Sequence, residues 1–277
     1  MNDLQRVELE ILKVFLEICN EEDLQYYLVC GSALGAVKYQ GFIPWDDDID
    51  VALPRVDYEK FIMVAHNYLP QYLFLQNYKT DREYHRIGSK LRDSRTTYIE
   101  RMTEDLNINQ GVFIDVFPLD GLWVTKKEQK EFKKIQKEYE VKRRVNLTYY
   151  RLSRENIFSI RTNLVYFLRC ITNCFSNTWK IIERYDHMIA AYSSEKSNMY
   201  CNFANSVSES EYSPKEQYGK GIMMKFEGLD VRVPEKYDDY LTQKYGDWRK
   251  ELPEKEQVGH HYYSILDLEN GYTKYMK

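Results

Sequence analysis

Hydrophobic positions recur at helical spacing in the first part of the chain and then give way to short apolar runs. Over residues 3–19 they recur at steps of three and four, with Asn2 or Asp3 available as the helix cap. Residues 26–30 form an aromatic and branched run, which is typical of a buried strand. The residues that follow Gly31-Ser32 predict a short helix.

The same alternation continues to about residue 120. A strand is expected over 48–54, ended by proline, and Asp57 is expected to cap an amphipathic helix that Pro70 stops. Further strands are expected at 71–76, in two pieces within 85–100, and at 111–117. Strands that alternate with short helices indicate an α/β or α+β core.

The pattern changes to helix from residue 126 to about 192, and this part of the chain is basic. Residues 126–184 contain 15 lysines and arginines against 6 acidic residues. Anionic lipid attracts such side chains, so peripheral contact of 126–184 with a membrane is one interpretation. A solvated basic face is the commoner one.

Composition narrows the class of protein. Hydrophobic residues make up 43% and charged residues 30%, which is typical of a globular chain. The net charge of −4 argues against a nucleic-acid binder. The N-terminus lacks a secretory signal, and the longest apolar stretch, 157–175, is interrupted by two arginines. Five scattered cysteines indicate reduced thiols. We therefore expect a cytoplasmic protein.

Four acidic residues point to chemistry. In an extended strand, the carboxylates of Asp46, Asp48 and Asp50 would share one face, where they repel one another unless a cation neutralises them. An exposed acidic turn is the usual alternative. Here, however, the acids lie between apolar segments, and Asp115 is embedded in an apolar run of its own. Oxygen ligands suit Mg²⁺ or Mn²⁺, so we predict a metal site.

These residues follow the pattern of the nucleotidyltransferase superfamily, in which a Gly-Ser pair precedes an acid–apolar–acid strand and a third acid. More narrowly, the chain resembles the LicD family of phosphocholine transferases. The resemblance rests on the motifs GSALGAVKYQGFIPWDDDIDVALPRVDYEKF, KLRDSRTTYIE, GVFIDVFPLDG and YLTQKYGDWRKELP.

The resemblance implies a nucleotidyltransferase-like mixed sheet flanked by helices, with an additional helical segment. Residues 1–125 would form the catalytic core and 126–195 the basic helical segment. Residues 196–277 would complete the site, packed on the core as one unit. The implied reaction transfers phosphocholine from CDP-choline to a sugar hydroxyl of a surface glycan, such as a teichoic acid or lipopolysaccharide precursor, whether or not it is lipid-linked. Relatives of this type are thought to transfer ribitol, glycerol or ethanolamine phosphate instead.

The same resemblance suggests roles for the acids. Asp48 and Asp50 would hold the metal that bridges the two donor phosphates, and Asp46 or Asp115 would help to bind a second ion. Asp115 is either the general base for the acceptor hydroxyl or a further metal ligand. Attack on the phosphorus that bears choline would release CMP.

Other residues are candidates for substrate binding. Gly31 and Ser32 would present N–H groups and a hydroxyl to phosphate at a helix N-terminus. Lys90 and Arg92 place basic groups near the same site, and Lys38 is a weaker candidate, as is Arg55. A solvated basic face is the alternative for each of these four.

Aromatic rings are expected to hold the quaternary ammonium of choline, which has no hydrogen to donate. Trp45 and Trp123 are the candidates, although packing is the commoner role of any single aromatic residue. His260 and His261 would point to opposite faces of an extended strand, so we expect no joint metal site there.

Two other functions stay open. One is a nucleotidyltransferase that moves a nucleoside monophosphate from a nucleoside triphosphate to a sugar or an antibiotic. The other is a binding module without catalysis, and the presence of Asp48, Asp50 and Asp115 argues against it.

Overall fold

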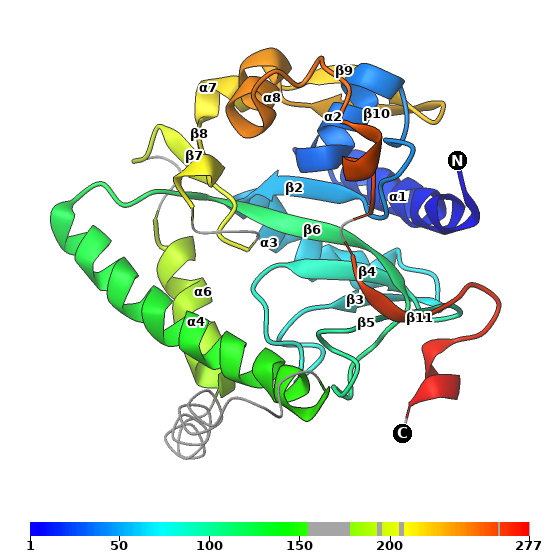
Figure 1. Ribbon diagram of the computed structural model, residues 1–277. Helices are drawn as coiled ribbons and strands as arrows, with labels where there is room; N and C mark the ends of the chain where they lie inside the picture. Colours follow the sequence, from blue (N-terminus) through cyan, green and yellow to red (C-terminus); the bar gives the residue numbers. More distant parts are fainter. Residues whose placement is uncertain (155–177, 193–195, 205–207, 260, 277) are drawn as a thin grey trace.

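The computed structural model describes residues 1–154, 178–192, 196–204, 208–259 and 261–276. Helix α1 (Asp3–Glu21) begins at Asn2, whose side chain accepts a hydrogen bond from the Gln5 backbone while the Gln5 side chain binds the Asn2 backbone. This capping box satisfies N–H groups that the first turn leaves free. The apolar stripe of α1 is buried against the central sheet (Figure 1).

The central sheet is mixed, as Figure 1 shows. Its main strands lie in the order β1 (Tyr27–Leu28), β2 (Asp50–Pro54), β6 (Val112–Gly121), β4 (Ser89–Asp93) and β3 (Leu73–Gln76). Strands β2 and β6 are parallel, whereas the other neighbours in this order are antiparallel. The far end of β6 pairs with β7 (Met199–Cys201), which pairs with β8 (Tyr212–Pro214).

Strand β6 is the centre of the molecule, because all ten of its residues are buried. Helices α1 and α3 (Arg55–Val64) both pack on it, as does α6 (Thr178–Ala190). A strand buried on both faces requires a continuous apolar run, and VFIDVFPLDG provides one that two aspartates interrupt. These two aspartates are therefore the polar groups that need a partner inside the core.

Elements in the last third of the chain pack against elements formed by its first 100 residues. The hairpin of β9 (Ile222–Phe226) and β10 (Leu229–Val233) packs on β1 and on α2 (Cys30–Tyr39). Helix α8 (Tyr237–Tyr245) also packs on α2 and on the short α7 (Lys215–Tyr218). Strand β11 (Tyr263–Asp267) pairs with β5 (Thr97–Glu100). The described residues also include the short 3₁₀ turns η1 (Ala65–Asn67), η2 (Glu209–Glu211), η3 (Glu254–Glu256) and η4 (Tyr272–Tyr275).

Helices α4 (Lys126–Arg154) and α6 pack on each other at one side of the sheet (Figure 1). Their contact forms a second core, in which Phe132 and Tyr139 meet Tyr185 and Ile189. None of the helices in the described ranges is both long and apolar enough to span a membrane. The apolar stretch 157–175 and the cysteines within it lie outside the described residues.

The predicted fold class, a mixed sheet flanked by helices with an additional helical part, is confirmed. Two local predictions were wrong. Helix α3 begins directly after Pro54, so Asp57 lies in its first turn instead of capping it. Strand β2 begins only at Asp50, and the residues from Asp46 to Ile49 form a loop, so Asp46 and Asp48 do not share a strand face with Asp50.

Candidate active site

Three neighbouring strands bring two acids and a lysine side by side. Asp50 is opposite Asp115 in the parallel pair of β2 and β6, and Lys90 is opposite Asp115 in the antiparallel pair of β4 and β6. Opposite residues on neighbouring strands project from the same face of the sheet. Asp48 joins them from the loop before β2, and one oxygen from each of Asp48, Asp50 and Asp115 lies within 4.8 Å of the others. This acidic triad is compact enough to share one cation.

The electrostatics of the triad favour a bound cation. Burial, reinforced by the neighbouring carboxylates of Asp48 and Asp115, raises the pKa of Asp50 well above its usual range. Burial also raises the pKa of Asp48 to about 6, although His261 acts in the opposite direction. Three hard oxygen donors that repel one another fit Mg²⁺ or Mn²⁺ by the chemistry of the donor set.

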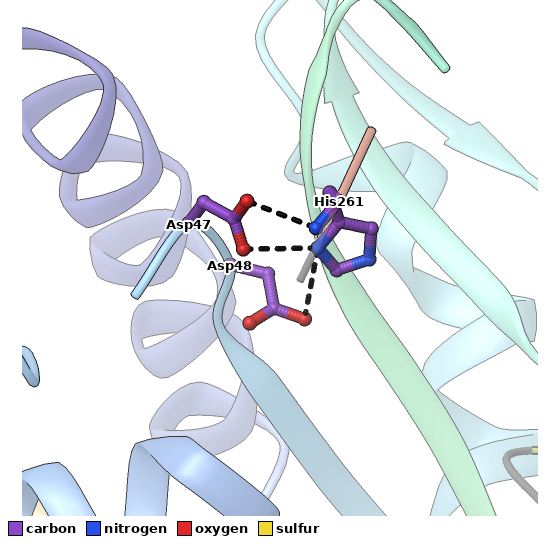
Figure 2. Close-up of side chains that lie close together, drawn as sticks. All are labelled: Asp47, Asp48 and His261. Atoms are coloured by element: carbon purple, nitrogen blue, oxygen red, sulfur yellow. Dashed lines mark hydrogen bonds and ion pairs between the residues drawn. The ribbon is translucent and has the colours of Figure 1, made fainter. Parts of the chain in front are cut away.

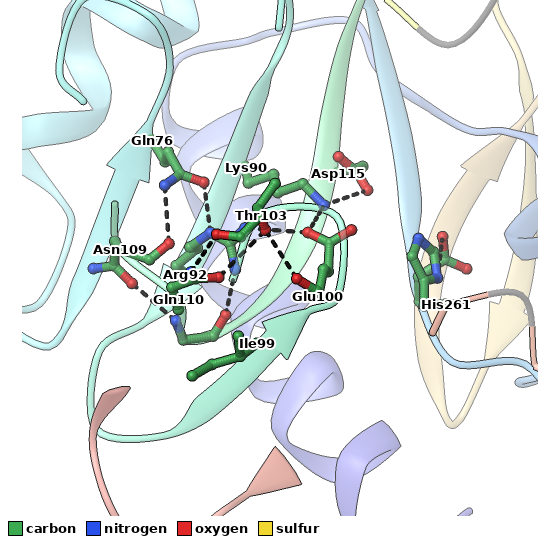
Figure 3. Close-up of polar contacts among 12 residues, drawn as sticks. Gln76, Lys90, Arg92, Ile99, Glu100, Thr103, Asn109, Gln110, Asp115 and His261 are labelled. Carbon is green, nitrogen blue, oxygen red and sulfur yellow. Dashed lines mark hydrogen bonds and ion pairs between the residues drawn. The ribbon is translucent and has the colours of Figure 1, made fainter. Parts of the chain in front are cut away.

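Lys90 orients the third acid of the triad. Its side chain is buried, and its Nζ lies 3.3 Å from Asp115 Oδ2 and 3.6 Å from Glu100 Oε2 (Figure 3). The same ammonium lies 3.1 Å from the centre of the Phe113 ring. Burial lowers the pKa of Lys90, while Asp115 and Glu100 oppose that effect. Lys90 therefore holds the Asp115 carboxylate in place from within the core.

Arg92 does not point to a phosphate site, which corrects our prediction. Its Nε donates to Gln76 Oε1 at 2.5 Å and its Nη1 donates to the Gly111 carbonyl at 2.6 Å (Figure 3). Its Nη2 also lies 3.6 Å from Glu100, and the whole side chain is buried. The guanidinium is thus engaged by internal partners, and its role is to hold β4 to the strands beside it.

The Gly31-Ser32 pair lies in the first turn of α2, next to the triad. Ser32 is buried, and its Oγ accepts a hydrogen bond of 2.8 Å from the Asp50 N–H, which anchors the start of β2. A Cβ on Gly31 would stand 2.8 Å from Asp46 Oδ2, which is too close for a side chain. Asp46 therefore packs against Gly31, and among the described residues it belongs to neither group of potential metal ligands.

A cavity of about 320 Å³ opens beside the triad. Its lining comes from two parts of the chain that are far apart in sequence. One part comprises Cys30, Gly31, Leu34, Lys38, Tyr39, Ile43, Trp45, Asp46, Asp48 and Asp50, and the other comprises Tyr245, Asp247, Trp248, Lys250, Glu251 and Leu252. The cavity thus joins the predicted acids and Trp45 with the C-terminal part of the chain.

Lys38 and Trp45 have different positions in this cavity. Lys38 Nζ donates to the Lys250 carbonyl at 3.0 Å and lies 2.9 Å from Glu251 Oε1, so it binds the opposite wall. Trp45 is half-buried and meets Tyr39 edge-on, with 6.5 Å between the ring centroids. A ligand in the cavity would therefore meet aromatic surface at Trp45 and an ion pair at Lys38.

Two of the predicted substrate-binding candidates lie outside the cavity. Trp123 packs against Phe132 in the second core, with the ring centroids 4.7 Å apart, so it is not part of the cavity. Arg55 is buried and donates to both Asp120 oxygens, at 2.6 and 2.8 Å. Both side chains are structural.

His261 is the residue that sequence reasoning missed. It follows the triad by more than 140 positions, yet its ring lies beside the loop before β2 (Figure 2). Nothing in its local sequence could have placed it there, because the contact depends on the return of the C-terminal part of the chain. Its neighbour His260 lies outside the described residues.

Comparisons with known proteins show which sequences this chain resembles. Residues 23–137 match the family model described as LicD/FKTN/FKRP, nucleotidyltransferase domain. The chain is 28% identical over 268 residues to the lipopolysaccharide cholinephosphotransferase LicD of Haemophilus influenzae, covering 94% of this chain and 96% of that protein. An uncharacterized protein of Rickettsia typhi is 33% identical over 63 residues, which are 23% of this chain and 19% of that protein.

Proposed function

From the premise that residues 23–137 are a nucleotidyltransferase domain of the LicD/FKTN/FKRP family, we propose that the protein transfers phosphocholine from CDP-choline to a sugar hydroxyl of a cell-surface glycan. A lipopolysaccharide is the acceptor named for the similar Haemophilus protein. A teichoic acid precursor would present the same kind of hydroxyl. The proposal makes the protein a phosphotransferase.

The observation that carries this proposal is the character of the cavity beside the triad. Its lining includes four aromatic residues. Besides Asp48 and Asp50, which would hold the cation, it has three carboxylates, of which Glu251 pairs with Lys38 and Asp247 with Lys250, so that Asp46 is left as a negative group. The aromatic residues are Tyr39, Trp45, Tyr245 and Trp248. A trimethylammonium group binds favourably to aromatic faces and to negative surroundings. Ribitol and glycerol carry no charge, so such a lining gives them no matching advantage.

The triad supplies the phosphate side of the donor. Asp48 and Asp50 would hold Mg²⁺ or Mn²⁺, and the bound cation would neutralise the two phosphates as charge develops during transfer. The acceptor oxygen forms a bond to the phosphorus that carries choline, the bond from that phosphorus to the bridging oxygen breaks, and CMP leaves. Asp115, oriented by Lys90, either accepts the proton of the sugar hydroxyl or adds a ligand to the cation.

The position of the acceptor bears on localisation. We propose that the protein works in the cytoplasm, at the inner face of the membrane if its acceptor is lipid-linked. The basic stretch 126–184 would then attract anionic lipid. Flotation with vesicles that contain phosphatidylglycerol tests this: recovery with the vesicles at low salt supports it, and recovery in the protein fraction at low salt contradicts it.

The test of the reaction is product identity. Purified protein is incubated with Mg²⁺, CDP-choline and lipopolysaccharide, and CMP is measured by chromatography. We expect CMP in proportion to phosphocholine bound to the glycan, and a loss of about a thousandfold in rate for Asp50→Asn, because a metal ligand contributes several kcal/mol to charge stabilisation. Asp230→Asn is the matched control, because the Asp230 side chain on the β9–β10 hairpin is exposed and pairs only with the exposed Lys225 in the described residues. Release of pyrophosphate from a nucleoside triphosphate, without CMP from CDP-choline, would replace this proposal with the nucleotidyltransferase reaction.

A further inference from the structure

Another cavity lies away from the acidic triad, between the loop that joins β3 to β4 and helix α6. Its volume is about 550 Å³, which is larger than that of the cavity beside the triad. The described residues of its lining are Lys79, Arg82, His85, Thr178, Trp179 and Lys180. Three of these side chains carry a positive charge, His85 adds an imidazole, and none of them is acidic. The described part of the wall therefore attracts anions.

The acidic residues of the same loop are committed to other partners. The Asp81 carboxylate accepts a hydrogen bond of 2.8 Å from the Asn109 N–H, and the Glu83 carboxylate accepts one of 2.7 Å from the Asn107 N–H. Both acids are thus held at the segment that precedes β6, and neither is among the described lining residues. The loop presents its basic side chains to the cavity and its acidic ones to the protein.

Three side chains of the wall are available to a ligand. Within the described ranges, the Lys79 and Arg82 side chains make no hydrogen bond and no ion pair. The Nδ1 atom of His85 is buried and has no hydrogen-bond partner there either, which is unfavourable. Burial lowers the pKa of His85, although Glu83 and Asp81 act in the opposite direction, so the ring is mostly neutral at pH 7 and has one N–H to donate.

Trp179 gives the cavity a fixed aromatic side. Its Nε1 donates to the Tyr78 carbonyl at 2.9 Å, and its ring meets the Tyr78 ring edge-on, with 6.0 Å between the centroids. Tyr78 is held in turn, because its hydroxyl donates to Asp186 Oδ2 at 2.9 Å. These contacts fix the indole while it stays half-buried. An aromatic face beside hydrogen-bond donors suits a sugar ring, which has apolar C–H groups and polar hydroxyls.

A short piece of chain joins this cavity to the triad. His85 precedes Lys90 by five residues, and Lys90 binds Asp115 of the triad. Five residues span at most about 18 Å even when they are fully extended. An oligosaccharide of several sugars can therefore contact the cavity while one of its hydroxyls reaches the triad.

We propose that this cavity binds a phosphate group of the acceptor glycan, with the sugar that carries it against Trp179; this rests on the proposed function, in which the acceptor is a glycan. Arg82 would bind two phosphate oxygens at once, because the planar guanidinium matches their spacing. Lys79 would add a second positive charge, and His85 a neutral N–H donor. The cavity would hold the acceptor and take no part in the transfer itself.

The test measures binding in the absence of CDP-choline, so its failure would leave phosphocholine transfer untouched. Isothermal titration calorimetry compares three probes. They are the phosphorylated core oligosaccharide released from lipopolysaccharide by mild acid, the same oligosaccharide after hydrogen fluoride has removed its phosphates, and inorganic phosphate. We expect the phosphorylated oligosaccharide to bind at least about tenfold more tightly than either of the others. Equal affinity for the two oligosaccharides, or for the phosphorylated one and inorganic phosphate, would overturn the proposal.

Variants assign the binding to the cavity. Lys79→Gln combined with Arg82→Gln should weaken binding of the phosphorylated oligosaccharide about tenfold and remove the preference for it over the dephosphorylated form. Arg6→Gln combined with Lys13→Gln is the matched control, because these two side chains make exposed ion pairs on α1, and it should keep both the affinity and the preference. Unchanged affinity in the first double variant would overturn the proposal. So would loss of its flotation with phosphatidylglycerol vesicles without loss of oligosaccharide binding, which would assign the cavity to lipid.

Discussion

At the scale of single residues, the phosphates and the choline group of CDP-choline would meet different surroundings. The acids of the triad lie close together, with Asp115 buried and Asp48 and Asp50 half-buried, whereas the half-buried Trp45 offers an aromatic ring at the cavity next to Asp46. A ring in this position can cover a cation that enters from solvent, because part of its surface is still free. Trp45 is therefore the residue on which the choice of alcohol depends most directly.

Replacing Trp45 by leucine should separate the donors. A cation–π contact is worth about 0.5–2 kcal/mol, so we expect Trp45→Leu to weaken binding of CDP-choline about tenfold and that of CDP-glycerol much less. Isothermal titration calorimetry with each donor and Mg²⁺ measures this. Tyr68→Leu, which removes an exposed aromatic residue away from the cavity, is the control and should leave both affinities unchanged. Equal losses for both donors would refute the aromatic site.

Some of these residues could be predicted from the sequence, and others could not. Asp48, Asp50 and Asp115 stand out because carboxylates within apolar segments are rarely buried without a partner. The functions of Arg92 and His261 depend on partners far along the chain, Gly111 and Gln76 for one and Asp47 for the other. Residue type alone suggested phosphate binding for Arg92, and for His261 it suggested only that no metal site would be shared with His260.

At the scale of elements, a buried arginine joins three of them. Arg55 opens α3 directly after β2 and binds Asp120 near the end of β6 through Nε and Nη2. Its Nη1 donates to Asp186 Oδ1 on α6 at 3.0 Å. The helical part of the chain is thus fixed to the sheet by a charged contact as well as by apolar packing.

Arg55→Leu should lower the free energy of unfolding by about 3–5 kcal/mol, because it leaves the buried Asp120 carboxylate unpaired and removes one of the partners of Asp186. Denaturation in urea, followed by circular dichroism, measures the change. Arg184→Leu is the control, since Arg184 on α6 makes an exposed ion pair with Glu138 that should be worth at most about 1 kcal/mol. Similar losses in the two variants would show that the buried contact is not structural.

Most elements could be predicted from periodicity, but their ends could not. The strand expected from residue 48 begins at Asp50, because the Asp50 N–H binds Ser32 and the preceding acids stay in a loop. That loop is what lets Asp48 reach both the triad and His261. A period-two pattern indicates that a strand is present, but it does not determine the residue at which the strand begins or ends.

At the scale of the whole molecule, the C-terminal part of the chain is built into the first part. The main core contains Tyr218, Phe226, Tyr240 and Trp248 together with the strands of the central sheet. The Tyr240 hydroxyl accepts a hydrogen bond of 3.1 Å from the Cys30 N–H at the start of α2. These contacts join residues that are far apart in the sequence, and a local sequence pattern cannot predict them. The part of the cavity lining that comes from residues 245–252 was therefore not predicted residue by residue.

This continuity of the core should give cooperative unfolding. We expect a single transition in differential scanning calorimetry, with equal calorimetric and van't Hoff enthalpies, because the sheet, the β9–β10 hairpin and α8 share buried side chains. Arg55→Leu should lower the midpoint of that one transition. Two separate transitions, one of which is unaffected by Arg55→Leu, would show that the parts fold independently.

The most direct measurement of the central claim is a thermal-shift series with CDP-choline, CDP-ethanolamine, CDP-ribitol, CDP-glycerol and nucleoside triphosphates, each with and without Mg²⁺. A ligand at about 100 times its dissociation constant adds roughly 2.7 kcal/mol, which corresponds to about 5–10 °C in a chain of this size. We expect CDP-choline with Mg²⁺ to give the largest shift, and Asp50→Asn to abolish it. Stabilisation by nucleoside triphosphates alone, or by CDP-choline equally without any divalent cation, would contradict a metal-dependent phosphocholine transferase.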